Sequence, residues 1–187
     1  MGANSHEAEV VYVGVGLPGA VISEARNEIE AVIEGLVGDR HFGITKPSGV
    51  RERIYRRGTT IRNNRQFSAT SAEELGTITK ALGLEELRPE WLGANLSLQG
   101  LPDLTHLPPL SRLVFPSGAV LLVYGENLPC KLPGEVIQHL YPEIPGLEPH
   151  FVKEAFGKRG VVGWIEVPGV IKLGDPVSVR LPKQAGS

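Results

Sequence analysis

The residue with the widest chemical range in this 187-residue chain is Cys130, its one cysteine. A lone thiol has no partner for an intramolecular disulfide, so it can serve as a core side chain, a nucleophile, a sulfur carrier or a soft metal ligand. Pro129 and Pro133 flank it, and proline continues neither a helix nor a central strand. We therefore expect Cys130 on a shaped loop at the end of the apolar strand at 119–124. We favour a functional role for it over a place in the core.

A second chemical feature is an arginine-rich segment at residues 40–65. It holds eight basic side chains against one acidic residue, Glu52, which gives it a charge of +7 in a chain of net charge -2. This charge either forms a solvated face or collects a polyanion, because arginine binds phosphate through two parallel hydrogen bonds. Between Arg51 and Arg65 the one aromatic residue is Tyr55, which argues against nucleic acid as the partner. The basic residues are Arg40, Lys46, Arg51, Arg53, Arg56, Arg57, Arg62 and Arg65.

The histidines are scattered, and none shows the spacing of a zinc site. His41 follows Asp39 and Arg40, and His41 with Asp39 forms a candidate for proton transfer. The alternative, that His41 only bonds to the backbone of its loop, stays open.

The segment Gly14–Gly19 matches the spacing of a dinucleotide-binding loop and follows a predicted strand. Pro18 interrupts the place where a helix would start, and the next apolar stretch alternates with period two. We therefore interpret these glycines as a turn.

The composition predicts a mainly β protein. Apolar residues make up 41%, and 23 glycines and 15 prolines favour many short elements joined by tight turns. We expect one domain over residues 1–187, with a core at about 10–181 and a frayed tail at 183–187. The patterns predict a helix capped by Thr70 or Ser71, a short helix at 134–141, and a long loop or excursion through the arginine-rich segment. They predict strands at 9–16, 27–35, 66–69, 93–98, 111–115, 119–124, 161–167 and 177–181.

Net charge and cysteine content indicate the cellular compartment and limit the classes of partner. A net charge of -2 gives no general signal for nucleic acid or membrane binding, and one cysteine indicates a reducing compartment. We see no signal peptide and no apolar run long enough to span a bilayer. A cytoplasmic protein that binds neither nucleic acid nor membrane is the expectation.

The order of several short motifs resembles the MOSC domain family, named for the C-terminal part of molybdenum-cofactor sulfurases. The resemblance covers about Val10 to Leu181. Its motifs are Gly35–Gly43, Arg65-Gln66, Ser71–Glu74, Leu92–Leu96, Pro129-Cys130 and Gly163–Val177.

The resemblance implies a β-barrel with a few peripheral helices and a cysteine, here Cys130, that carries sulfur or ligates molybdenum. It implies that Gly38-Asp39, Arg65-Gln66 and Asn95 belong to the site. The molybdenum cofactor carries a phosphate, so we expect Arg40, Arg56 and Arg57 to help hold it.

Three functions follow from the resemblance and the residues. The first is a molybdenum-cofactor protein that reduces N-hydroxylated small molecules, with Cys130 as metal ligand. The second is a sulfur carrier with a persulfide on Cys130. The third is a non-enzymatic module that binds an anion or a partner through its arginines. The first two need a separate redox or sulfur-donor protein, because the chain is too short to contain a desulfurase domain.

Overall fold

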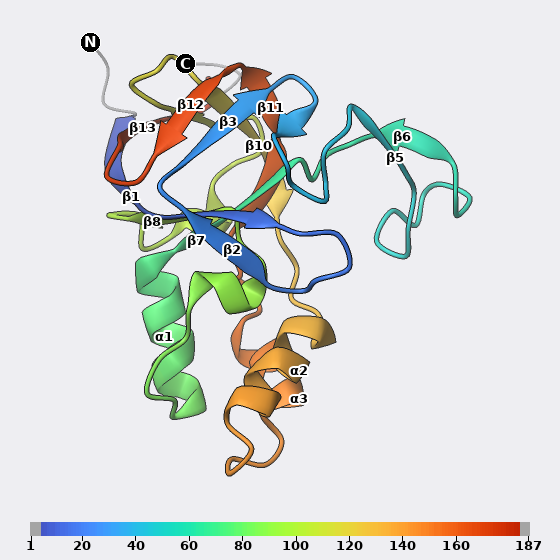
Figure 1. The fold of residues 1–187 in the computed structure, drawn as a ribbon, viewed down its shortest axis with the longest axis vertical. Coiled ribbons are helices and arrows are strands. Elements are labelled where there is room, and N and C mark those ends of the chain that lie inside the picture. Colours follow the sequence, from blue (N-terminus) through green and yellow to red (C-terminus); the bar gives the residue numbers. More distant parts are fainter. Residues whose placement is uncertain (1–4, 184–187) are drawn as a thin grey trace.

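The computed structural model describes residues 5–183, and a closed β-barrel forms its larger part (Figure 1). The barrel strands are, in chain order, β1 (Ser5–Gly16), β7 (Phe67–Ser71), β8 (Leu96–Gln99), β9 (Arg112–Val114), β10 (Val120–Glu126), β11 (Val161–Val167) and β13 (Pro176–Arg180). Around the ring they lie in the order β13, β9, β10, β11, β7, β8, β1, and a β1–β13 pairing closes it. β2 (Ser23–Arg26) adds to β1 outside the ring. The predicted mainly β barrel is confirmed.

Alternating side chains of these strands fill the barrel. Leu121 and Val123 of β10 and Val177 and Val179 of β13 are fully buried in one hydrophobic core. Successive side chains of a strand point to opposite faces, so this alternation sends one apolar set inward. The predicted hairpin of strands 111–115 and 119–124 is confirmed by the β9–β10 pairing.

A small second sheet lies against the barrel. It consists of β3 (Glu28–Val32), β4 (Gly35–Leu36) and β12 (Gly169–Lys172), with β3 in the centre. Ile29 and Ala31 are buried, whereas Glu28 and Glu30 are exposed. This confirms the period-two strand predicted at 27–35. β12 was missed, because its four residues were interpreted as a connection.

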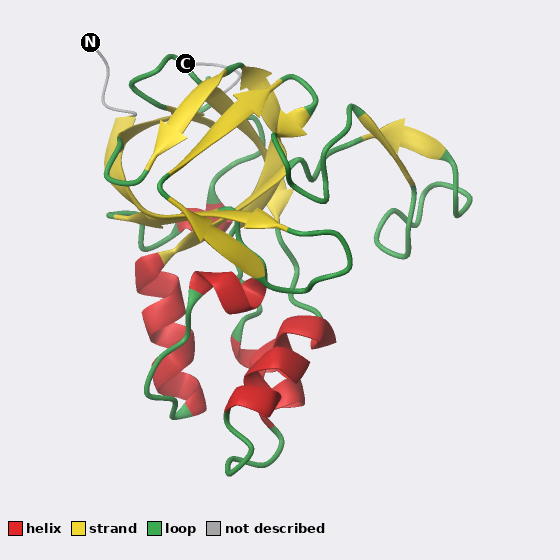
Figure 2. Ribbon diagram, viewed as in Figure 1, coloured by secondary structure: helices red, strands yellow, loops and turns green. Residues whose placement is uncertain are grey.

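The helices gather at one end of the barrel around a core of their own (Figure 2). They are α1 (Ala72–Leu82), α2 (Lys131–Leu140), α3 (Leu147–Glu154) and the short 3₁₀ turn η1 (Pro89–Leu92). Ile78, Ile137 and Phe151 are fully buried between them. A second 3₁₀ turn, η2 (Leu104–His106), instead packs its Leu104 into the barrel core. α3 was not predicted.

Helix α1 begins and ends as its sequence predicts. The Ser71 hydroxyl accepts a hydrogen bond from the Glu74 backbone N–H at 3.1 Å. Gly83 ends the helix with φ of 67°, a left-handed conformation that glycine adopts without steric cost.

The arginine-rich segment forms an arm rather than a plain loop. β5 (Thr45–Pro47) pairs with β6 (Thr60–Arg62), and this hairpin stands to the side of the barrel in Figure 1. The predicted excursion is present, but the short hairpin within it was not predicted. The paired strands are only three residues long and show no clear alternation of burial.

The glycine-rich segment after β1 is a turn leading into β2, as predicted, and no helix follows it. Among the described residues, no helix has the length and apolar character needed to cross a membrane.

Candidate functional site

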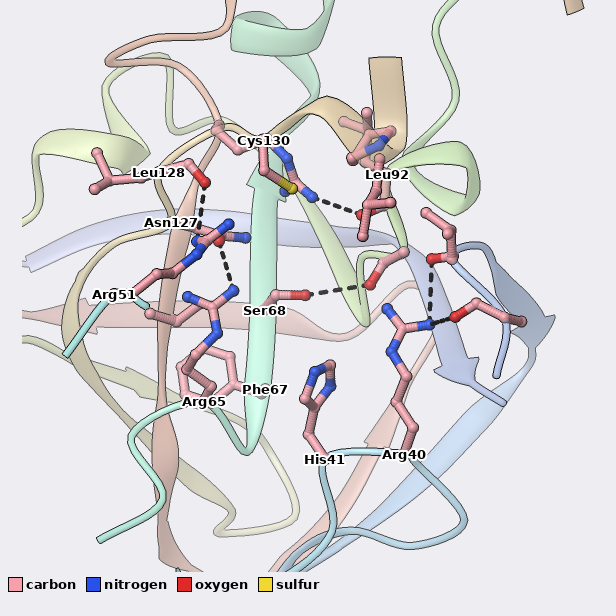
Figure 3. A pocket seen from close by; sticks show the side chains of 17 residues that line it. Arg40, His41, Arg51, Arg65, Phe67, Ser68, Leu92, Asn127, Leu128 and Cys130 are labelled. Carbon is pink, nitrogen blue, oxygen red and sulfur yellow. Dashed lines mark hydrogen bonds between the residues drawn. The ribbon is translucent and has the colours of Figure 1, made fainter. Parts of the chain in front are cut away.

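Cys130 lines a cavity of about 230 Å³ between the barrel and the helices (Figure 3). The walls come from β7, η1, the segment between β10 and α2, and the residues before β11. Cys130 itself is half-buried. The one thiol of the chain therefore faces a cavity, and its role toward a ligand stays a prediction.

Cys130 is the residue that precedes the first turn of α2, and its side chain makes no capping hydrogen bond. As predicted, Cys130 lies on the loop that follows the strand β10, but α2 begins at Lys131, earlier than the predicted start at residue 134. Pro133 lies within the first turn, where a backbone N–H has no partner inside the helix, so proline is tolerated there. The sulfur is thus held at a helix N-terminus, where the helix dipole favours negative charge.

Four arginines from distant segments line the cavity with Cys130, namely Arg40, Arg51, Arg65 and Arg159. Arg51 reaches from the arm and donates from Nη1 to the Leu128 carbonyl oxygen at 3.0 Å. Arg65 donates from Nη2 to Oδ1 of Asn127 at 2.8 Å. Both bonds end on the segment that leads into Cys130, so these arginines also position the thiol.

The Arg40 guanidinium packs closely against two glycines, Gly16 and Gly93. Its Nη1 donates to the Ala20 carbonyl oxygen at 2.6 Å. A Cβ on Gly93 would lie 2.6 Å from Arg40 Nη2, and a Cβ on Gly16 would lie 3.0 Å from the Arg40 guanidinium carbon. The Arg40 side chain could shift to relieve the first approach, but a Cβ on Gly93 would also lie 2.3 Å from the Val21 backbone oxygen, and Gly93 has a φ of +64°, so this position requires glycine. The Gly93 within the family-like motif is thereby explained.

Arg159 is the site residue that sequence reasoning missed. It is only 6% exposed, and its Nη2 donates to the Leu92 carbonyl oxygen at 2.5 Å. Its Nη1 is buried and has no hydrogen-bond partner within residues 5–183. Buried polar atoms are nearly always paired, so an unpaired guanidinium nitrogen at a cavity indicates a place for an anionic acceptor.

Arg159 is fixed by its neighbour Gly160. The Gly160 N–H donates to the Thr105 hydroxyl at 2.7 Å, and that hydroxyl donates to Glu74 at 2.8 Å. A Cβ on Gly160 would lie 1.9 Å from the Ala69 carbonyl oxygen, so this close approach requires glycine. Gly160 next to an arginine, directly before a strand, was the one local signal in the sequence.

Burial lowers the pKa values of two arginines in the cavity, Arg65 and Arg159. Burial, and then the charge of Arg51, lowers the pKa of Arg65 to about 10. Burial also lowers the pKa of Arg159 to about 10, while the nearby Cys130 opposes this shift and Arg65 adds to it. Both side chains remain charged at neutral pH. An anion in the cavity would relieve their mutual repulsion.

Asp39 and His41 form a hydrogen-bonded pair at the cavity wall. Asp39 is buried, and its carboxylate accepts from the N–H groups of Gly16 at 2.7 Å and His41 at 2.8 Å. His41 Nδ1 lies 3.2 Å from Asp39 Oδ1, and His41 itself lines the cavity. Burial raises the pKa of Asp39, but the hydrogen bonds from His41, Gly16 and Asn95 together hold it below its ordinary value.

Gln66 and Asn95 lie behind the cavity wall rather than in it. Asn95 Nδ2 donates to Asp39 Oδ2 at 2.7 Å, and its Oδ1 accepts from the Ser68 N–H at 2.9 Å. Gln66 accepts from the Ile165 N–H at 2.9 Å and donates to the Ile33 carbonyl oxygen at 3.0 Å. Their amide groups therefore join strands, and their direct contact with a cofactor stays a prediction.

Arg56 and Arg57 are exposed on the arm and are not among the residues that line the Cys130 cavity. The structure thus brings together Cys130, His41, Arg40 and Arg65 of the predicted site residues. It adds Arg51 and Arg159, and it leaves Arg56 and Arg57 apart.

The sequence matches a known family model and a known protein over most of its length. Residues 38–178 match the family model of the MOSC domain. The chain is 47% identical over 159 residues to YuaD of Bacillus subtilis (strain 168), whose name refers to metal-sulfur cluster biosynthesis; the match covers 85% of this chain and 83% of that protein.

Solved structures agree in fold. The crystal structure of YuaD from Bacillus subtilis superposes with a TM-score of 0.93 at 42% identity, covering 96% of this chain and 98% of that one. YiiM from Geobacillus stearothermophilus gives a TM-score of 0.61 at 16% identity, covering 96% of this chain and 77% of that one. YiiM from Escherichia coli gives 0.55 at 15% identity, covering 96% and 72%. The likeness to the two YiiM structures concerns the fold alone.

Proposed function

The chain belongs to the MOSC domain family, and from that membership we propose that it binds the molybdenum cofactor with Cys130 as metal ligand and reduces N-hydroxylated small molecules. The observation that carries the proposal is a half-buried thiol in a cavity lined by four arginines. A thiolate is a soft ligand that suits a thiophilic metal, and guanidinium groups suit a phosphate. The reaction takes two electrons and two protons and yields an amine-type product and water, with the electrons supplied by a separate donor protein.

The residues present fit an anionic group. Arg159 Nη1 is buried without a partner among the described residues, and the cavity it lines holds Arg40, Arg51 and Arg65 as further donors. A neutral ligand would leave these charges uncompensated. In this proposal Arg159 and Arg65 hold the phosphate-bearing group, and Arg51 fixes the segment before Cys130.

When bound, the cofactor supplies the two-electron redox chemistry. The protein's own part is to orient the substrate and to deliver protons. His41 Nδ1 faces Asp39, which leaves Nε2 as the nitrogen able to give a proton to the departing oxygen. Asp39, held by Gly16 and Asn95, keeps the imidazole ring in that orientation.

Metal analysis tests this proposal. Protein made in a host that synthesises the cofactor is expected to contain molybdenum close to one atom per chain, and Cys130→Ser is expected to lose it. Arg57→Gln is the matched control, because Arg57 is exposed and lines no part of the cavity. Equal molybdenum in wild type and Cys130→Ser removes Cys130 as the ligand.

Sulfur transfer is a second candidate, favoured by the position of Cys130 at the N-terminus of α2. The Cys130 thiolate would attack the outer sulfur of a donor persulfide, forming a new S–S bond as the donor's S–S bond breaks and its thiolate leaves. The Cys130 persulfide would carry a negative charge that the helix dipole and the arginines favour. The name of the relative YuaD, which refers to metal-sulfur cluster biosynthesis, accords with this candidate. Mass spectrometry showing one added sulfur on Cys130 in molybdenum-free protein would support it over the first proposal.

A further inference from the structure

A second cavity, of about 380 Å³, lies beside the Cys130 cavity between the arm and the barrel. The two cavities share four lining residues, Arg51, Arg65, Leu128 and Val162. A ligand in the second cavity would therefore lie next to the site of Cys130. None of the functions proposed above assigns it a role.

One wall of this second cavity is a supported aromatic ring, that of Tyr124. A bulge in β10 makes Tyr124 the extra residue, because Val123 pairs with Gly163 and Gly125 with Val162. The Tyr124 ring packs against Trp164, with ring centroids 6.0 Å apart. The Arg62 guanidinium lies 5.5 Å from the Trp164 ring and supports the pair from the arm. Tyr124 remains about half exposed, so one part of its surface is open to a ligand.

The facing wall is the tip of the arm, which its own hydrogen bonds hold in shape. Ser48 donates from its hydroxyl to the Arg56 carbonyl oxygen at 2.7 Å, and the Gly58 N–H donates back to the Ser48 carbonyl oxygen at 3.0 Å. Glu52 accepts from the Gly49 N–H at 2.8 Å and pairs with Lys46 at 2.5 Å. This tip presents Ile54, which is 86% exposed, and Tyr55 to the second cavity.

The charge of the second cavity is positive once its internal pairs are counted. Arg51, Arg53 and Arg65 line it together with two carboxylates. Glu52 is paired with Lys46, and Glu126, which accepts from the Gly157 N–H at 3.0 Å, keeps its charge, so the arginines outnumber the uncompensated acid. Arg53 lines the cavity and makes no hydrogen bond or ion pair with any residue in the described part of the chain. An unpaired arginine at the rim of an apolar and aromatic cavity favours a carboxylate or a similar anion.

Asn64 adds a hydrogen-bond acceptor that has no donor among the described residues. Asn64 lines the second cavity, and its Oδ1 is buried and has no hydrogen-bond partner within residues 5–183. A ligand that donates an O–H or N–H to this oxygen would satisfy it.

From these observations we propose that the second cavity binds a flat aromatic acid that also carries a hydrogen-bond donor, and that this compound is separate from any cofactor in the Cys130 cavity. Its ring stacks on Tyr124, its acid group pairs with Arg53, and its donor reaches Asn64. The proposal does not depend on molybdenum. Binding of the aromatic acid can therefore be shown or refuted separately from the proposed molybdenum function.

The probe is para-hydroxybenzoate, and the signal is the fluorescence of Trp164. The chain has two tryptophans, so a Trp91→Phe background leaves Trp164 as the one reporter. We expect saturable quenching by para-hydroxybenzoate, weaker binding of benzoate, and little binding of the neutral para-hydroxybenzamide. Arg53→Gln is expected to weaken binding roughly tenfold, and Tyr124→Leu roughly three- to tenfold.

Two variants make the test specific. Arg57→Gln, on the same arm but outside both cavities, is expected to change binding by less than about twofold. Cys130→Ser is expected to leave binding unchanged. The proposal is overturned by equal binding of the acid and the amide, by equal effects of Arg53→Gln and Arg57→Gln, or by no saturable binding at millimolar probe.

A final experiment distinguishes an independent ligand from the aromatic ring of the cofactor. The titration is repeated on protein that carries molybdenum, with the molybdenum content measured on the same sample. We expect para-hydroxybenzoate to bind with the same affinity. Loss of binding in the molybdenum-containing protein would assign the second cavity to the cofactor and contradict the proposal.

Discussion

The guanidinium of Arg65 donates from Nη2 to Oδ1 of Asn127 at 2.8 Å, across 62 residues of sequence. This bond joins the segment before β7 to the segment before Cys130. Arg65 is charged and largely enclosed, so its acceptor both satisfies a buried donor and fixes the wall that carries the thiol. The placement of Cys130 therefore depends on a long-range polar contact as much as on its own helix.

Removing the acceptor should destabilise the protein. Asn127→Ala leaves a buried guanidinium nitrogen unpaired, which costs about 1–3 kcal/mol of unfolding free energy. Urea denaturation followed by circular dichroism measures this cost. Arg57→Gln, at an exposed position, should stay within about 0.5 kcal/mol of wild type. Equal unfolding free energies of Asn127→Ala and wild type would show that the Arg65–Asn127 hydrogen bond does not stabilise the fold.

Arg159 should serve binding rather than stability. Arg159→Met keeps much of the side-chain volume and removes a desolvated charge, so we expect unfolding free energy within about 1 kcal/mol of wild type. Inorganic phosphate should raise the melting temperature of wild type and have at least about tenfold weaker affinity for the variant. Calorimetric titration and thermal melts measure both. An Arg159→Met protein that binds phosphate like wild type would remove Arg159 from the anion site.

Much of the fold could be predicted from the sequence, and the exceptions have physical reasons. Ser71, Leu75, Ile78 and Gly83 mark a helix locally, and the structure shows that helix. Cys130 was correctly predicted on the loop after β10, but the helix that follows it was predicted to begin at residue 134. It begins at Lys131, because Pro133 falls in the first turn, where proline has little cost. Local patterns locate elements well but do not fix which residue begins them.

The candidate site could be predicted only in part, because the cavity is made by contacts between distant segments. Arg56 and Arg57 have the same local charge density as Arg51, but the fold of the arm directs only Arg51 to Leu128. Arg159 stands outside the arginine-rich segment and enters the cavity only through the path of the chain before β11. Sequence charge density therefore indicated Arg40 and Arg65, which line the cavity, but it could not separate them from Arg56 and Arg57 or reveal Arg159.

Asp39 should contribute stability that disappears in acid. Its pKa in the folded protein lies below its ordinary value, so its contribution is complete above the ordinary aspartate range near pH 4 and is lost as pH falls through the lower folded value. Asp39→Asn should cost about 1–3 kcal/mol at neutral pH, because an amide accepts fewer of the bonds from Gly16, His41 and Asn95. The gap between variant and wild type should narrow as pH falls below about 4. A gap that is constant with pH contradicts this account of Asp39.

His41 should act on the rate of the proposed reduction and not on cofactor content. His41→Gln removes the proton donor but keeps a side chain of similar reach, so turnover should fall by about 10²–10⁴-fold. Molybdenum content and melting temperature should match wild type. Turnover assays with an N-hydroxylated substrate, and a pH profile of the rate, measure the effect. Unchanged turnover in His41→Gln would assign His41 to structure alone.

The ligand set of the metal shows directly whether Cys130 binds molybdenum. X-ray absorption at the molybdenum edge, on protein from a cofactor-competent host, counts the sulfur atoms bound to the metal. We expect one sulfur fewer in Cys130→Ser than in wild type, or no molybdenum in the variant. An identical sulfur count with full molybdenum content in both proteins would contradict it.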